Sequence, residues 1–143
     1  MSGAEVARRK LRKLSEYLSE LSLVAGYSYE EYLKDIFVKR TAERSLQLIV
    51  ECATDVCDHL LAELNYPPPK DYYESFIKAG EASVISSTLA QEIAPSAGLR
   101  NVIVHEYEDI KDEKVYESIG QALKSFRQLI KEINDFITLM ENK

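Results

Sequence analysis

The sequence predicts an all-α protein: a four- to five-helix antiparallel bundle in a single domain of residues 1–143. Apolar residues recur at spacings of three and four through most of the chain, which is the period of an amphipathic helix. No segment alternates apolar and polar residues as a half-buried strand does. Five glycines and four prolines leave few break points, so the helices are expected to be long.

The first helix is expected over residues 6–23. Its apolar face consists of Leu11, Leu14, Leu18 and Leu21. Ser28 and Glu31 then have the spacing of a capping box, which predicts the start of another helix. This second helix is expected to begin at Ser28 or Tyr32 and to reach Leu64, where three consecutive prolines follow and end it.

The second half of the chain predicts three further helices. A short one is expected over residues 72–78, closed by Gly80. The next is capped by one of two adjacent serines and runs to about Tyr107, with a kink at Pro95 because the proline ring removes one backbone hydrogen bond. The last opens at Asp112 and keeps a regular apolar rhythm almost to the end of the chain.

Charge and composition exclude several classes of protein. The 18 basic and 24 acidic residues give a net charge of −6, which argues against a protein held to nucleic acid mainly by a basic surface. No run approaches the ~20 apolar residues of a membrane span, and the N-terminus lacks the apolar stretch of a signal peptide. Cys52 and Cys57 have no C-x-x-C spacing and are expected to be reduced thiols in a cytoplasmic protein.

Three titratable residues share one face of the long second helix, because Glu51, Asp55 and His59 follow one another at spacings of four. A metal site needs three or four ligands, usually with some from a second helix, and no matching Glu-x-x-His occurs elsewhere. A polar ridge with paired charges is therefore the favoured interpretation over a metal site, and no bound metal is expected.

A second polar group lies near the end of the proline-containing helix. Arg100, Asn101, His105 and Tyr107 bring together a permanent cation, an amide, an imidazole and a phenol. Arginine suits phosphate because its planar fork donates two hydrogen bonds, and histidine can move a proton near neutral pH. The spacing fits phosphodiester chemistry, and it fits equally a capping cluster at a helix end.

The pattern Arg100-Asn101-x-x-x-His105-x-Tyr107 resembles the R-x-x-x-x-H-x-Y motif of HEPN-domain proteins. Specifically, it is similar to the HepT-type toxins, whose partner is a minimal nucleotidyltransferase (MNT) antitoxin. The order of a long second helix, a proline-broken connection, a motif helix and an amphipathic C-terminal helix agrees with this family over residues 11–136. The resemblance implies a single HEPN-like domain.

The resemblance also implies an activity. It is that of a metal-independent endoribonuclease toxin that works as a homodimer, with Arg100 and His105 as the catalytic pair and Asn101 as a supporting polar residue. Tyr107 matches the tyrosine to which the antitoxin transfers AMP, using ATP and magnesium, so this chain itself needs no cofactor. The partners implied are RNA, a second copy of the chain and the nucleotidyltransferase, with no membrane.

Two other interpretations stay open. The same four residues can form a non-catalytic module that binds a nucleotide or docks the nucleotidyltransferase. Six carboxylates against two lysines over residues 106–117 favour this module, because the resulting charge of −4 would repel RNA. A purely structural helical module would be indicated by a monomer with a buried, fully hydrogen-bonded His105.

A basic segment and a predicted dimer surface complete the expectations. Residues 1–13 carry a net charge of +4 and can either flank an RNA cleft in a dimer or form a solvated helix end. The long helix carries more apolar surface than the neighbours expected from one small chain could cover, which predicts a homodimer. The predicted contact surfaces are the motif helix and one side of the long helix, made of Leu46, Val50, Ala53, Cys57 and Leu61.

Overall fold

The computed structural model describes residues 1–143 and consists of helices joined by short connections, with no strand. The elements are α1 (Gly3–Ser22), α2 (Tyr29–Lys34), α3 (Ile36–Glu63), α4 (Tyr72–Glu81), α5 (Ser87–Ile93), α6 (Ser96–His105), the short 3-10 helix η1 (Tyr107–Asp109) and α7 (Asp112–Glu141). The all-α prediction is therefore confirmed.

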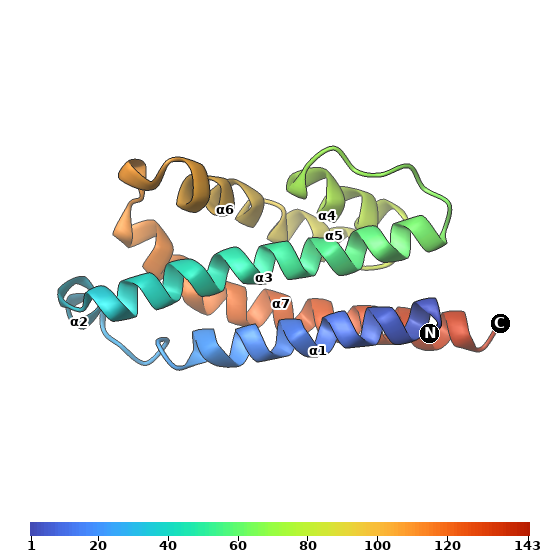
Figure 1. Cartoon of the computed structure of the whole chain (residues 1–143), viewed down its shortest axis with the longest axis horizontal. Helices are drawn as coiled ribbons and strands as arrows, with labels where there is room; N and C mark the ends of the chain where they lie inside the picture. Colours follow the sequence, from blue (N-terminus) through green and yellow to red (C-terminus); the bar gives the residue numbers. More distant parts are fainter.

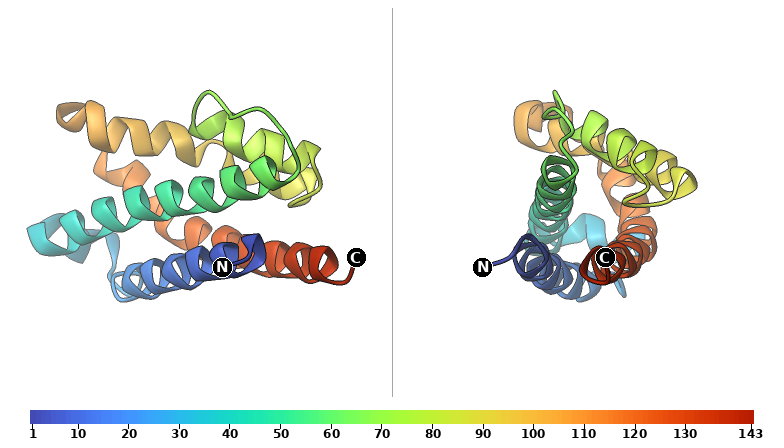
Figure 2. Two further views of the ribbon diagram at one scale, coloured as in Figure 1. Left: turned by 45° about the vertical axis from the view of Figure 1, so that its right-hand side comes forward. Right: turned by 90° about the vertical axis from the view of Figure 1, so that its right-hand side faces the viewer.

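The helices form an elongated bundle with four sides (Figure 1). The long helices α1, α3 and α7 each provide one side, and the shorter α4, α5 and α6 together provide the fourth, as the end-on view in Figure 2 shows. Both chain termini lie at one end of the bundle, whereas α2 and η1 lie at the other (Figure 1). A two-pronged ion pair between Arg8 and Glu141, with N–O distances of 2.6 and 2.8 Å, joins the first and last helices.

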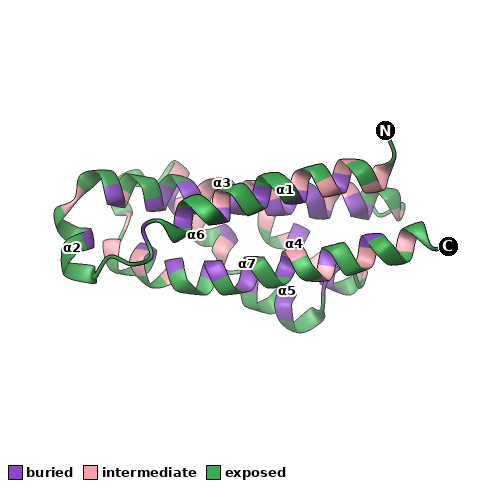
Figure 3. Ribbon diagram, turned by 90° about the horizontal axis from the view of Figure 1, so that it is seen from below, coloured by how far each residue is buried: buried purple, intermediate pink, exposed green.

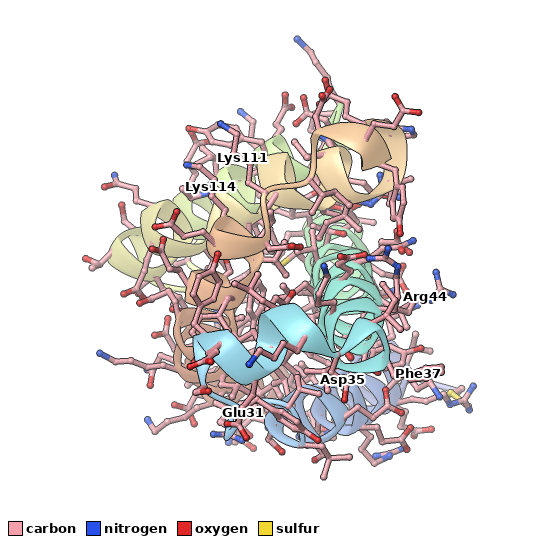
Figure 4. All side chains as sticks on the ribbon, turned by 90° about the vertical axis from the view of Figure 1, so that its left-hand side faces the viewer. Glu31, Asp35, Phe37, Arg44, Lys111 and Lys114 are labelled. Atoms are coloured by element: carbon pink, nitrogen blue, oxygen red, sulfur yellow. The ribbon has the colours of Figure 1, made fainter.

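The predicted helix from Ser28 or Tyr32 to Leu64 is divided in two, so its predicted start is wrong. The capping box is present at the start of α2: the Glu31 N–H donates to Ser28 Oγ, and the Ser28 N–H donates to Glu31 Oε1. The division occurs at Asp35, whose backbone is extended and whose carboxylate accepts the N–H groups of two following residues. Aspartate is a strong N-cap, so it begins a new helix at the corner seen in Figure 4.

A kink was predicted at Pro95, and the helix is interrupted there, between α5 and α6. The motif helix α6 is therefore short, and it ends at His105, two residues earlier than predicted. Glu106 leaves the helical region with φ −125° and ψ 48°, which places Tyr107 in η1 rather than on the motif helix.

The core lies between all four sides and contains most of the apolar residues of α3. Figure 3 shows the buried residues of α1 and α7 as stripes along each helix. The side of α3 that was predicted to form a dimer contact is between 0% and 4% exposed within the single chain: Leu46, Val50, Ala53, Cys57 and Leu61. That predicted contact surface is wrong, because these residues lie in the core of the single chain, where α3 packs against α1, α4, α6 and α7. None of the helices combines the length and apolar character needed to cross a membrane.

Gly80 lies inside α4 rather than closing it, and its role is close packing. A Cβ at position 80 would lie 2.6 Å from the Ala90 Cβ on α5, which is too close for two atoms fixed to backbones. We expect Gly80→Ala to destabilise the protein by about 1–3 kcal/mol. Gly120→Ala on α7 is the matched control, because nothing lies within 4 Å and alanine favours a helix by about 1 kcal/mol. Urea denaturation showing no loss of stability for Gly80→Ala would contradict this packing.

Candidate functional site

The candidate site lies where α6 and η1 pack against the outer part of α3. Ala97 and Ile103 are buried and fix the rotation of α6. That rotation directs Arg100 toward α3, whereas Asn101 and His105, one helical turn apart, face solvent. The local sequence therefore separates the two residues of the predicted catalytic pair, which lie about 140° apart around the helix axis.

Arg100 is held firmly in place although it lies near the surface. Its Nε and Nη2 donate to Glu51 Oε2 on α3 at 2.9 and 2.6 Å, and its guanidinium lies 4.5 Å from the centre of the Tyr72 ring. Gln47 donates to the same carboxylate oxygen at 3.0 Å. The Arg100 side chain is only 12% exposed as a result.

The donors of Arg100 are not exhausted by these contacts. Nη1 donates one further bond, to the Asn101 Oδ1 at 3.2 Å. Since each terminal nitrogen carries two N–H groups and uses one, one N–H on each is left for an incoming acceptor. A guanidinium fixed along one edge and open at its terminal nitrogens is suited to hold a phosphate.

The ridge on α3 is divided among separate partners. Glu51 binds Arg100, Asp55 binds Lys10 on α1, and His59 Nε2 lies 3.0 Å from the carbonyl oxygen of Gly3. The interpretation as a ridge of paired charges is confirmed for Glu51 and Asp55. No group of three or more histidine, cysteine, aspartate or glutamate residues could hold a metal ion.

His105 is the last residue of α6 and is exposed, and its side chain makes no hydrogen bond within the chain. Residues 105–109 line a shallow recess, so His105 shares it with Glu106, Glu108 and Asp109. The recess is acidic, as predicted. An exposed and unpartnered His105 is the opposite of what a purely structural module would show.

Tyr107 follows in η1 and is 50% exposed. The guanidinium of Arg40 on α3 lies 5.0 Å from the centre of its ring. Tyr107 therefore lies beside α3 and not on the helix that carries Arg100. Arg40 and Tyr72 were not predicted as parts of the site. The only sequence signal for Arg40 is its three-residue spacing to Glu43, and that spacing pairs opposite charges on any helix, so it does not indicate a functional site.

The basic N-terminal segment does not flank His105 within one chain. It lies on α1, toward the end of the bundle that carries both termini (Figure 1). Three of its five cations are already paired, with Glu141, Asp55 and Glu16 respectively: Arg8, Lys10 and Lys13. In the single chain this segment is therefore mostly a paired helix surface.

Known proteins resemble this chain over nearly its whole length. Residues 10–133 match the family model described as Ribonuclease HepT-like. The tRNA nuclease HepT of Aphanizomenon flos-aquae is 33% identical over 96% of this chain and 94% of its own length. The mRNA nuclease HepT of Shewanella oneidensis is 21% identical over 88% of this chain and 94% of its own length.

Solved structures show the same fold. A tri-AMPylated HEPN toxin of Shewanella oneidensis, in complex with an MNT antitoxin, superposes with a TM-score of 0.83 at 21% identity, covering 94% of this chain and 99% of the toxin. The cytosolic protein YutE of Bacillus subtilis, of unknown function, superposes with a TM-score of 0.78 at 16% identity, covering 93% of this chain and 92% of YutE.

Proposed function

This chain belongs to the HepT-like ribonuclease family, and on that premise we propose that it is a metal-independent endoribonuclease toxin, neutralised by a nucleotidyltransferase antitoxin. The observation that supports cleavage is the arrangement of α6. It presents an anchored arginine with free N–H groups and, one and a half turns later, an exposed histidine without a partner. A cation for the phosphate and a group that moves protons are functions that cleavage at a phosphodiester requires.

The proposed reaction uses the RNA 2′-hydroxyl as its nucleophile. His105 accepts the hydroxyl proton, the 2′-oxygen bonds to phosphorus, and the bond to the 5′-oxygen breaks. The leaving 5′-oxygen takes a proton from a protonated His105, so the products carry a 2′,3′-cyclic phosphate and a 5′-hydroxyl. Arg100 stabilises the negative charge that develops on the phosphate oxygens. An internal nucleophile needs no metal-bound water, and DNA, which lacks the 2′-hydroxyl, is not cleaved.

Because Arg100 and His105 diverge on α6, the proposal includes a homodimer that gathers the pairs of two chains at a two-fold axis. The exposed face of α6, which carries Asn101 and His105, is available for this contact, whereas the predicted side of α3 is buried. Phe37 at the start of α3 is a further apolar residue on the surface, 82% exposed (Figure 4). We expect light scattering to give about twice the monomer mass of 16.3 kDa. A monomer at micromolar concentration would contradict the shared site.

The proposed function is tested with purified chain and RNA in EDTA. Cleavage is expected, with cyclic phosphate ends, and a DNA of the same sequence should stay intact. Cleavage that appears only after a divalent metal is added would contradict the proposed reaction.

A non-catalytic docking or nucleotide-binding module is the second candidate. The observation that favours it is the acidic recess, since Glu106, Glu108 and Asp109 surround His105 and repel RNA. Under this candidate RNA stays intact in the experiment above, while the chain still binds the nucleotidyltransferase in a pull-down.

Glu51 is expected to act as a positioning residue for Arg100. We predict that Glu51→Gln lowers the initial rate of RNA cleavage about tenfold, because a misplaced catalytic group loses alignment with the phosphate. Asp55→Asn is the matched control: it lies one turn further on α3 and binds Lys10 instead. A Glu51→Gln variant faster than the unmodified sequence would show instead that Glu51 keeps Arg100 away from RNA.

A further inference from the structure

Tyr107 has a specific cationic neighbour that the proposed reaction does not use. The Arg40 guanidinium on α3 lies 5.0 Å from the centre of the Tyr107 ring on η1. Both side chains are accessible, since the Arg40 side chain is 46% exposed and Tyr107 is 50% exposed. The pair joins residues 67 positions apart in the sequence and lies on the bundle surface, at the end away from the termini.

Arg40 is anchored by a carboxylate that is itself buried. Its Nη1 lies 3.0 and 3.2 Å from the two carboxylate oxygens of Glu43, whose side chain is only 5% exposed. Burial raises the pKa of Glu43, and the guanidinium opposes that rise by favouring the charged form. The N–H groups of Nε and Nη2 have no partner in the chain, so Arg40 is held at one nitrogen and open at the other two.

The side chains around Tyr107 are mostly acidic, so an anion attached to Tyr107 would depend on the Arg40 cation. Glu106, Glu108 and Asp109 adjoin the tyrosine and make no ion pair. The neighbouring Lys39 is occupied by Asp112 at 3.0 Å. A phosphate attached to Tyr107 would thus lie near three carboxylates, and Arg40, which contacts the ring, would offer it a cation with free donors.

We propose that Arg40, anchored by Glu43, binds the phosphate of a nucleotide attached to Tyr107 and so holds that nucleotide against α3. The inference rests on the proposed function, in which Tyr107 accepts AMP. In that transfer the phenol oxygen bonds to the α-phosphorus of ATP, the bond to the β-phosphate oxygen breaks, pyrophosphate leaves, and the phenol proton is released. The product is a phosphodiester with one negative charge, which a guanidinium binds through charge-assisted hydrogen bonds.

The experiment uses full-length chain produced together with its nucleotidyltransferase, with the adduct confirmed at Tyr107 by mass spectrometry. The modified protein is then treated with a phosphodiesterase, and the rate of AMP release is measured. Arg40→Gln is expected to speed release about tenfold, the effect of losing one hydrogen bond to a charged group. Arg40→Lys should recover part of the protection, because it keeps the charge but loses the planar fork.

Arg44→Gln is the matched control, since Arg44 lies one turn further on α3 and makes no ion pair or ring contact. Equal release from all variants, or equally fast release from Arg44→Gln and Arg40→Gln, would overturn the proposal. Arg40→Gln leaves the buried Glu43 carboxylate without its partner. The double variant Arg40→Gln/Glu43→Gln removes that carboxylate as well, and it must also release AMP fast. A chain that acquires no AMP, or acquires it on another residue, would instead contradict the proposed function, and the inference would fall with it.

Discussion

Replacing His105 by alanine is expected to lower the rate of RNA cleavage by about 10²-fold or more, the effect of removing a group that transfers a proton. The fold should be unaffected, because the His105 side chain is exposed and makes no hydrogen bond within the chain. The loss of rate can therefore be assigned to the chemistry and not to unfolding.

The chain contains its own control for this substitution, since its other histidine, His59, lies on α3 and contacts the Gly3 carbonyl near the opposite end of the bundle. The cleavage rates of the variants are measured under identical conditions, with thermal unfolding in parallel. The His59→Ala variant should cleave RNA at the rate of the parent sequence. Equal rates for His105→Ala and the parent sequence would remove His105 from the reaction. Arg100→Lys should also lose about 10²-fold, because lysine cannot bind Glu51 and a phosphate together through one planar fork.

Replacing Tyr107 by phenylalanine is expected to abolish AMP transfer while leaving RNA cleavage intact. Only the phenol oxygen is lost, so the acceptor disappears but the ring beside Arg40 remains. In the parent chain, attached AMP adds bulk and negative charge close to His105, which should repel the substrate phosphate and lower cleavage at least about tenfold.

Mass spectrometry after production with the nucleotidyltransferase measures the transfer, as a shift of one or more AMP units. Tyr73→Phe is a suitable control, because Tyr73 is 55% exposed but belongs to α4 and has no cation over its ring. A Tyr107→Phe chain that still gains AMP would assign the modification to another residue. A parent chain that is inhibited without modification would leave direct binding as the means of neutralisation.

The helices could be predicted from the sequence because local patterns determine most of them. The leucines of α1 repeat with the helical period, and the prolines after Asn65 leave no way to continue α3. The break at Asp35 escaped prediction because the apolar pattern continues on both sides of it. An N-cap there competes with a continuous helix, and periodicity alone does not decide between the two.

The site could be predicted only where its residues are close together in the sequence. Arg100 and His105 were predicted on one helix, and both lie on α6. The contacts that organise these residues join distant positions: Glu51 with Arg100, and Arg40 with Tyr107. Such pairs leave no periodic trace in the sequence. The wrong dimer surface has the same cause, because the burial of α3 depends on where α4 and α6 pack.

The position of α7 has a consequence for synthesis. It follows α1 and α3 in the chain and forms one wall of the core, with buried residues from Val115 to Ile137 that pack against those two helices. A nascent or prematurely terminated chain lacking this wall leaves the apolar stripe of α1 open to chaperones and proteases. Folding therefore waits until α7 has been synthesised, and under the proposed function a chain that stops before α7 is a harmless fragment instead of a nuclease.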